Sequence, residues 1–362
     1  MNNIDFKKLG DYVKIKTGKL DANASSEDGE YPFFTCSIEP LKISSYSYDC
    51  ECCLVAGNGD LNVKYYNGKF DAYQRTYIIE SLDKEKLDVM YLYFFLSSYI
   101  EVLRKQSIGG VIKYIKLGNL TDALIPIPEL SKQKEICQNL IKAKKILSSN
   151  ENLLSKYDTL IKSRFIEMFG DNQTLEFQTL ENICSIITDG THQPPKFTTT
   201  GIPFLFVSNI AGNKITYETE KFISERTYEE LYKRTPIEIG DVLLSTVGSY
   251  GHPAIVENDN KFLFQRHIAY LKPKKDFINS IYFHGTLLSP DAQKQIEERV
   301  KGIAQKTLNL SEIRKIKIPV PPLSLQNDFA TFVQQIDKSK FEIWRYLKFS
   351  DIINKIGFRF YD

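Results

Sequence analysis

Two stretches of the chain repeat apolar residues at alternating spacings of three and four, which is typical of a long helix that packs on another helix. The first is predicted to run from an N-cap at Ser131 to Gly170, because prolines block a helix just before it and a glycine ends it. The second is predicted to begin at Ser324 and to fade before Gly357. The two apolar seams consist of Ile136, Leu140, Ala143, Leu147, Leu154, Tyr157 and Ile161 in the first stretch, and of Phe329, Val333, Ile336, Ile343 and Leu347 in the second.

A helix of about 39 residues is roughly 58 Å long, and a single apolar seam along it needs a partner. If the two helices pack parallel, the blocks that precede them lie side by side. If they pack antiparallel, the blocks lie at opposite ends, related by a pseudo-two-fold axis. The short connection at 169–178 favours the antiparallel arrangement.

The block before each long helix follows one plan. It begins with β-branched and aromatic residues between Gly and Asn turns, which predicts short strands. A helix is predicted next, over about 91–105 in the first half and 281–300 in the second. A glycine-containing loop, a short strand that ends in a proline-rich pair and the long helix complete each half.

The two halves also match residue by residue. Gly109 corresponds to Gly302 and Lys113 to Lys306, which is an offset of 193 that also aligns IPIP with IPVP and Gln133 with Gln326. Order is kept further upstream while the offset shrinks. The matched pairs there are Gln74-Arg75 with Gln265-Arg266, Gly59-Asp60 with Gly240-Asp241, and KKLGDYVKIKTGK with QTLENICSIITDG.

This order indicates a duplicated domain whose copies differ in their loops. We predict an α+β fold with two similar mixed α/β domains, separated by two long helices that pack as an antiparallel coiled coil with a pseudo-two-fold internal repeat. The predicted divisions are a first domain at 1–130, a helix at 131–170, a second domain at 171–323, and a helix with the C-terminal tail at 324–362.

Composition restricts the class of protein. Of the 362 residues, 42% are hydrophobic and 25% are charged, which argues against a disordered chain. The net charge of +2 excludes a histone-like protein, although it does not exclude local basic patches. No apolar run reaches the ~18 residues of a membrane span, and the first residues lack the apolar segment of a signal peptide. We therefore expect a cytoplasmic protein without a membrane association.

Motifs for catalysis or metal binding are not found. Cys50 and Cys53 form one C-x-x-C within a predicted strand, without a second pair at zinc-finger spacing, so buried thiols in a reducing compartment are the preferred interpretation. The four histidines lie in different segments. Neither Gly18-Lys19 nor Gly68-Lys69 completes a P-loop. Residues 193–196, Gln-Pro-Pro-Lys, lack the first residue and the aromatic of an adenine-methyltransferase motif. We expect no metal and no catalytic residue in this chain.

The plan of variable block, long helix, variable block and long helix resembles the specificity subunit of Type I restriction-modification systems. The resemblance covers essentially the whole chain and rests on the order and duplication of its segments. These are GNGDLNVKYYNGKFDAYQRTYII and IPIPELSKQKEI in the first half, and ITDGTH, GIPFLFVSNI, GDVLLSTVGSYG, FLFQRHIAYLKP and IPVPPLSLQNDF in the second.

The resemblance implies that each block is a target recognition domain that reads one half of a bipartite double-stranded DNA target. The helices would set the unread gap and dock methyltransferase subunits, of which we expect two, and these would let restriction subunits join. Catalysis would belong to those partners, with S-adenosylmethionine, ATP and Mg as their cofactors and none in this chain.

The residues agree with a bipartite reader in several respects. Half-site separation follows protein geometry, so two reading modules need a stiff spacer. Loops rich in Lys, Asn, Ser, Thr and Tyr supply both phosphate and base-edge contacts. The candidate DNA-binding residues are Lys16, Lys19, Asn58, Asn62, Lys64, Tyr65, Arg75, Lys113, Thr191, His192, Thr246, Ser249, Tyr250, His252, Arg266 and Lys306.

The repeat suggests how to divide these candidates. Two domains that read different sequences share scaffold and phosphate contacts, and they differ at the residues that choose bases. Arg75 and Arg266 are therefore either buried arginines that brace a strand or phosphate clamps. Lys113 and Lys306 are either phosphate contacts or solvated lysines. Asn62, Lys64 and Tyr65, against Thr246, Ser249, Tyr250 and His252, are the better candidates for base choice, with ordinary surface-loop residues as the alternative.

Two other functions remain open at this stage. The first alternative is the recognition part of a self-contained restriction or methylation enzyme. The second is a coiled-coil adaptor that binds only protein. Binding of S-adenosylmethionine to the isolated chain would favour the enzyme. Failure to bind mixed-sequence duplex DNA would favour the adaptor.

Overall fold

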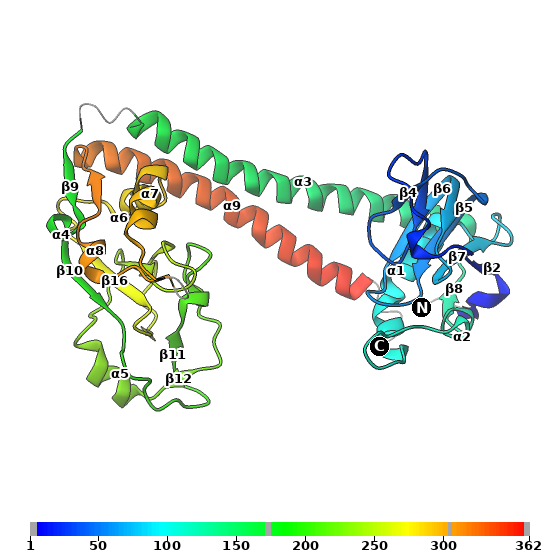
Figure 1. Cartoon of the computed structure of the whole chain (residues 1–362), viewed down its shortest axis with the longest axis horizontal. Coiled ribbons are helices and arrows are strands. Elements are labelled where there is room, and N and C mark those ends of the chain that lie inside the picture. The colour runs from blue at the N-terminus through cyan, green and yellow to red at the C-terminus, as the bar shows by residue number, and fades with distance from the viewer. Residues whose placement is uncertain (1–5, 171–174, 303–305, 358–362) are drawn as a thin grey trace. The chain divides into compact units, whose positions relative to one another are not determined.

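The computed structural model describes residues 6–170, 175–302 and 306–357. The chain forms two units that divide inside both long helices, between Asn150 and Glu151 and between Lys348 and Phe349, with Glu151–Lys348 forming the second unit. Figure 1 labels the elements of each unit along the chain. Each unit is described by itself.

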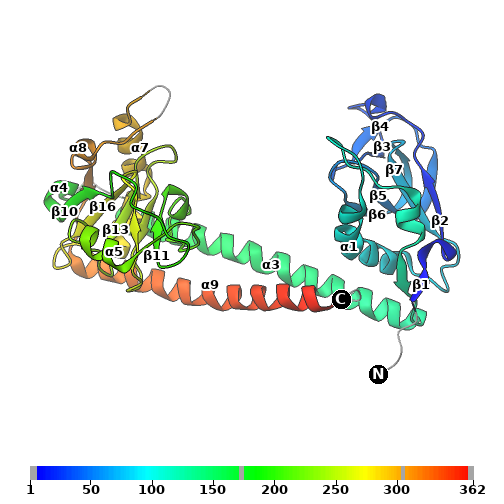
Figure 2. The same ribbon diagram turned by 90° about the horizontal axis from the view of Figure 1, so that it is seen from below.

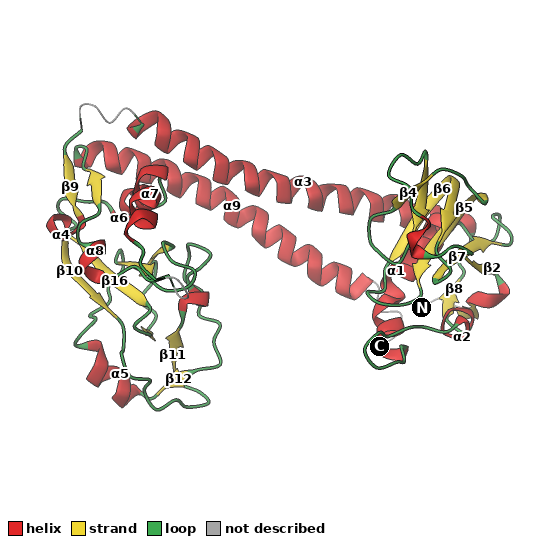
Figure 3. Ribbon diagram, viewed as in Figure 1, coloured by secondary structure: helices red, strands yellow, loops and turns green. Residues whose placement is uncertain are grey.

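The first unit is built on a six-stranded sheet of order β2-β7-β5-β6-β3-β4. All neighbours in it are antiparallel except β3 and β6, which pair in parallel. Figure 3 shows these strands in yellow. Their bounds are β2 Val13–Thr17, β3 Tyr31–Phe34, β4 Leu41–Ile43, β5 Tyr48–Ala56, β6 Val63–Ala72 and β7 Thr76–Ser81.

Alternating burial along β5 explains how this sheet forms two cores. Cys53 and Val55 lie in the core that includes helix α1 (Val89–Gln106), whereas Cys52 and Leu54 lie in a second apolar cluster. Successive side chains of a strand point to opposite faces, so each face buries every second residue. The unit also contains a two-stranded sheet of β1 (Phe6–Lys8) and β8 (Leu124–Pro126), with helix α2 at Leu117–Thr121.

The second unit divides its strands among smaller sheets, of orders β10-β16-β13-β14, β12-β11-β15 and β17-β9. The strands are β9 Phe177–Thr179, β10 Cys184–Asp189, β11 Ile202–Leu205, β12 Phe222–Ile223, β13 Val242–Ser245, β14 Pro253–Ile255, β15 Leu263–Phe264, β16 Ile268–Pro273 and β17 Lys317–Pro319. The short helices are α4 Leu180–Ile183, α5 Glu225–Tyr232, α6 Ser280–Leu287, α7 Pro290–Arg299 and α8 Leu310–Ile313.

The same construction occurs in both units, which confirms the predicted internal repeat and the α+β class. Strand β2 is antiparallel to β7, as β10 is to β16. Strand β3 is parallel to β6, as β11 is to β15. The hydroxyl of Tyr91 donates to the carbonyl oxygen of Pro126 at 3.0 Å, and that of Tyr282 donates to Pro319 at 2.8 Å. The shared residues thus hold equivalent strands to equivalent helices.

One predicted equivalence is wrong. The structure pairs β5 with β7 and β13 with β16, so Gly59 after β5 is equivalent to Gly248 after β13. Gly240-Asp241 instead precedes β13 and corresponds to the interior of β5. The Gly-Asp dipeptide recurs at two different places in the fold, and two residues are too short a string to fix an alignment.

The prediction of a single helix over 281–300 is also wrong, because the structure divides this segment into the two helices α6 and α7. Pro290 has no N–H to continue the first helix, and it occupies the first turn of the second. Ser289 accepts a hydrogen bond from the backbone N–H of Ala292 and caps α7. The first-half counterpart, α1, has no proline and stays continuous.

The two long helices are α3, at Leu130–Phe169, and α9, at Leu323–Gly357. Each begins one residue before the predicted N-cap, so Ser131 and Ser324 lie inside the first turn. Every predicted seam residue is half-buried or buried, with exposed residues between them. The heptad pattern therefore identified the packed faces correctly.

Contacts inside the second unit show that the helices run antiparallel, as predicted. Phe165 of α3 packs on Phe329 of α9 with ring centroids 5.4 Å apart, and the ammonium of Lys340 lies 2.5 Å from the carboxylate of Asp158. Residue numbers rise along α3 as they fall along α9, and Figures 1 and 2 both show the two helices side by side in this unit. The predicted division of the chain into four ranges stays a prediction.

Candidate nucleic-acid interface

Each unit carries the same loop at the end of its central strand. Gly59 after β5 and Gly248 after β13 have φ angles of 69° and 72°, a conformation that side chains disfavour. The amide of Gly59 donates to the carbonyl oxygen of Lys113 at 3.0 Å, and the amide of Gly248 donates to that of Lys306 at 3.3 Å. The structure thus brings together the predicted loops and the predicted lysines in both halves.

The lysine segments themselves are equivalent in backbone. Ile108 forms an antiparallel bridge with Tyr114, as Lys301 does with Thr307. The side chains of Lys113 and Lys306 are exposed, in agreement with both predicted roles. An exposed ammonium whose backbone is fixed is suited to a phosphate contact, because such contacts set position without reading sequence.

In the first unit, the predicted base readers are bonded to a neighbouring loop. The thiol of Cys36 donates to the side-chain oxygen of Asn58 at 2.8 Å. The side-chain amide of Asn62 donates to the carbonyl oxygen of Cys36 at 2.8 Å, and the ammonium of Lys64 donates to Asn62 at 2.6 Å and to the carbonyl oxygen of Thr35 at 3.3 Å. Burial lowers the pKa of Lys64. These side chains hold the loop together.

Two further candidates of this unit are occupied by internal contacts. The hydroxyl of Tyr65 donates to Glu51 at 2.8 Å, and burial followed by that hydrogen bond raises the pKa of Tyr65 to about 12. Lys16 forms an ion pair of 2.6 Å with Glu80, whose hydrogen bond raises the pKa of Lys16. Lys19 is exposed beside this strand. Of these three residues, Lys19 is the most exposed, while Lys16 and Tyr65 are half-buried.

The arginines of the two Gln-Arg pairs are exposed, so the alternative of a buried arginine that braces a strand is wrong. Arg75 contributes its backbone instead, since its carbonyl oxygen accepts from the amide of Gly57 at 2.7 Å. The Nε of Arg266 lies 3.4 Å from the ring of His267, whose pKa is lowered by burial and by the arginine charge. The phosphate-contact interpretation of both arginines stays a prediction.

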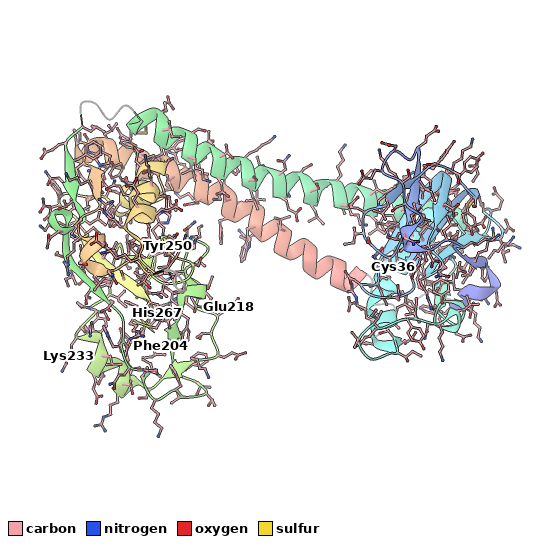
Figure 4. The ribbon with its side chains drawn as sticks, viewed as in Figure 1. Cys36, Phe204, Glu218, Lys233, Tyr250 and His267 are labelled. Carbon is pink, nitrogen blue, oxygen red and sulfur yellow. The ribbon has the colours of Figure 1, made fainter. Side chains whose placement is uncertain are left out.

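In the second unit, Ser249 and Tyr250 line an open hollow of about 520 Å³ between the loop after β13 and helix α7. The ammonium of Lys306 lies 5.9 Å from the centroid of the Tyr250 ring. Figure 4 marks Tyr250 and His267 in this unit. The remaining residues of the hollow are Gly248, Pro290, Gln293, Lys294 and Glu297.

The other candidates of the second unit differ in accessibility. Thr246 is only 5% exposed, and a buried hydroxyl does not reach a base edge unless the loop rearranges. His252 is half-buried, with Nδ1 3.1 Å from the side-chain oxygen of Asn213. His192 is exposed and lies 2.8 Å from Asp189. The half-buried Thr191 accepts from the amide of Arg266 at 3.1 Å, so these two candidates are neighbours.

Sequence reasoning missed the loop that follows β3 in the first unit and β11 in the second. A signal was present, because Tyr31-Pro32-Phe33-Phe34 and Ile202-Pro203-Phe204-Leu205 align at the same offset as the N-terminal segments of the two halves. Each of these strands is followed by a loop that is hydrogen-bonded to the predicted recognition loop.

The part of the chain that the structure describes also bears on metal sites and membrane-spanning helices. No group of three His, Cys, Asp or Glu side chains is arranged to hold a metal ion among these residues. Cys50 and Cys53 are three positions apart in β5 and therefore point to opposite faces of the sheet. Within the same residues, no helix is long and apolar enough to cross a membrane.

The chain resembles known proteins in its family pattern, its sequence and its fold. A family model described as the Type I restriction modification DNA specificity domain matches residues 1–156 and 172–348. The chain is 42% identical over 139 residues to the Type I restriction enzyme EcoDI specificity subunit of Escherichia coli, which is 38% of this chain and 31% of that protein. It is 22% identical over 316 residues to the EcoBI specificity subunit, also of Escherichia coli, which is 79% of this chain and 66% of that protein.

These matches thus span less than two thirds of either relative. Among solved structures, the S subunit of a Type I restriction-modification system from M. genitalium superimposes with a TM-score of 0.64 at 18% identity, covering 99% of this chain and 96% of that one. At this identity the likeness concerns the fold, which the two chains share over nearly their whole lengths.

Proposed function

The chain belongs to the family of Type I restriction-modification DNA specificity proteins, and from this premise we propose that it selects the DNA target of such a complex. Each of its two domains reads one half of a bipartite sequence in double-stranded DNA. The paired long helices set the length of the unread gap between the halves.

The observation that carries this proposal is the duplicated loop and lysine structure. The Gly59–Lys113 and Gly248–Lys306 hydrogen bonds fix an exposed lysine beside a loop in each domain. The loops around these anchors differ between the domains, since the strand registers place Asn58, Asn62 and Lys64 where the other domain has Val247, His252 and Ala254. A common anchor with different loops is what two readers of different half-sites require.

The partners follow from the same proposal. Two methyltransferase subunits bind the long helices, and restriction subunits join through them. Methylation with S-adenosylmethionine and ATP-driven cleavage with Mg occur in those subunits, while this chain supplies recognition. Such a complex works on cytoplasmic DNA.

The experiment is to purify the chain with the methyltransferase subunit of its own system and to map the methylated adenines in DNA of random sequence. The expected result is a split motif, with two short specified parts separated by a gap of fixed length. A continuous motif, or the absence of methylation together with the absence of DNA binding, would overturn the proposal. Binding of S-adenosylmethionine by the isolated chain would assign the catalysis to this chain and contradict the division of labour.

A further inference from the structure

The hydrogen bonds of the first domain reverse the roles that the sequence predicts for its loops. Asn58, Asn62 and Lys64 turn their polar atoms toward Thr35 and Cys36, at the start of the loop 35–40 that joins β3 to β4. Asn62 and Lys64 each donate two hydrogen bonds inside the protein and the side-chain oxygen of Asn58 accepts one, which reduces their capacity to bond to a base edge. These three residues brace the neighbouring loop.

The braced loop presents its own tip to solvent. Thr35, at its base, is 6% exposed, and its hydroxyl accepts from the amide of Ser37 at 3.2 Å. Ser37, Ile38 and Glu39 are all exposed, and the apolar Ile38 is 66% exposed. Rigidity at the base with exposure at the tip is the arrangement that binding sites need, because little ordering entropy is lost on contact.

We propose that loop 35–40 is a base-reading element of the first domain, with Ser37, Ile38 and Glu39 at the base edges. This inference rests on the proposed function and names the residues that act in one half of it. The chemistry of the three side chains fits the major groove. A carboxylate accepts from the amino group of cytosine, an aliphatic side chain contacts the methyl group of thymine, and a serine hydroxyl bonds to either kind of base.

The loop that follows β11 in the second domain is also held by side-chain hydrogen bonds, which come from other residues. In the loop that follows β11, the side chain of Asn209 accepts from the amide of Phe206 at 2.9 Å and donates to the carbonyl oxygens of Thr216 and Glu218 at 3.0 and 2.9 Å. Asn213 of this loop meets His252 of the recognition loop. Figure 4 labels Glu218 in this segment and Cys36 in the loop that follows β3.

The test uses the chain assembled with its methyltransferase subunit and compares single variants of the tip with a matched control. Glu39→Gln and Ile38→Ala change exposed side chains of the tip, of which Glu39 also interacts electrostatically with Lys64. Glu27→Gln removes the same charge from an exposed residue ahead of β3 and serves as the control. Binding is measured by competition among duplexes in which each specified base pair is replaced in turn.

We expect each tip variant to change the preference at one or two base pairs of a single half-site by about tenfold, since a good base contact is worth about 1–3 kcal/mol. The other half-site and the gap stay as in the parent, and the control leaves every position unchanged. The triple variant of Ser37, Ile38 and Glu39 to alanine extends the test to the whole tip.

The inference is overturned if the triple variant keeps the parent's thermal unfolding curve and all base preferences within twofold. That result, obtained with a parent protein that does recognise a split motif, leaves the proposed function intact. A parent protein without a split motif defeats the proposed function instead. If the control changes a half-site as the tip variants do, the effect belongs to surface charge and the inference fails.

Discussion

At the scale of single residues, the proposed function assigns DNA positioning to the residues that the two halves share and base reading to those in which they differ. Lys113 and Lys306 share a backbone anchor and an exposed ammonium, although the loops beside them differ. A phosphate contact contributes equally at every sequence, and it releases a counterion on binding. Shared, exposed cations should therefore govern affinity and its salt dependence, and leave the choice of bases unchanged.

Replacing Lys113 by alanine is expected to weaken binding to all duplexes by a similar factor and to reduce the slope of log K against log salt by about 1. The measurement is a salt titration of affinity on a specific and a mixed-sequence duplex. Lys134→Ala is the matched control, because Lys134 is also exposed but lies on α3. An unchanged slope for Lys113→Ala would contradict its role as a phosphate contact.

His284 makes the stability of the second domain depend on pH. Its Nε2 lies 3.1 Å from the carbonyl oxygens of both Asn213 and Pro253, so a neutral ring donates from this atom. Burial lowers the pKa of His284, with Lys214 acting in the same direction and Asp337 opposing it. The unfolded chain, with a pKa of about 6.5, takes up the proton first as the pH falls.

The contribution of His284 is therefore fully present above about pH 6.5 and is lost as the pH falls from there toward the lower pKa of the folded state. Between pH 7.5 and 5.5, the free energy of unfolding should fall by about 1 kcal/mol more in the parent than in His284→Gln. Urea unfolding at the two pH values measures this. Equal losses in the two proteins would show that His284 is not the titrating group, since His267 is present in both.

The local sequence does not show which side chains of the site are buried by contacts inside the protein. Asn62, Lys64 and Tyr65 have the composition of a reading loop, yet the structure commits all three to internal hydrogen bonds. Loop 35–40 sets the direction of Asn62 and Lys64, and Glu51 sets that of Tyr65, and neither partner is adjacent in sequence. The alignment of the two halves placed Lys113 and Lys306 correctly beside their loops. Such an alignment depends on the order of residues along the chain and not on the direction in which side chains point.

At the scale of elements, long periodic segments were predictable and short ones were not. The seams of α3 and α9 repeat over many turns, so single exceptions such as Asn150 and Lys340 did not disturb the prediction. The break between α6 and α7 depends on one proline, and the misplaced Gly-Asp match depended on two residues. The pairing of β5 with β7 and β13 with β16 is a tertiary fact that corrected the alignment.

The joint between each long helix and its domain is a buried glutamine. The side-chain oxygen of Gln133 accepts from the amide of Asp88 at 2.9 Å, and its nitrogen donates to the carbonyl oxygens of Lys86 and Pro128 at 2.7 and 2.8 Å. Gln326 repeats these bonds in the second unit with the amide of Asn279 and the carbonyl oxygens of Phe277 and Pro321, and neither glutamine is exposed. The helix start and the cap of α1 or α6 are thereby tied together.

Gln133→Ala should lower the free energy of unfolding of the first unit by about 2–4 kcal/mol, because three backbone groups lose their partner in a buried site. Gln138→Ala, on the exposed face of the same helix, should change it by less than about 0.5 kcal/mol. Denaturant unfolding of the full chain gives both values. A loss for Gln133→Ala no larger than that of the control would show that water replaces the glutamine without cost.

At the scale of the whole molecule, two domains and an antiparallel helix pair act as one reader only if the helices keep a fixed length. The pair offers a direct way to change that length. Asp158 of α3 faces Lys340 of α9, so one heptad inserted after Asp158 and one inserted before Lys340 pair with each other and preserve both seams.

This double insertion adds about 10.5 Å of helix, at about 1.5 Å per residue, which corresponds to about three base pairs of B-DNA. On the proposal that the helices set the gap, the mapped motif should keep both half-sites and lengthen its gap by about this amount. A single residue inserted at the α3 position is the control, because it rotates the seam by about 100° and should abolish binding through loss of packing. If the double insertion is stable and methylates with the parent gap, the helices are not the ruler, and the spacing must be set by the partner subunits.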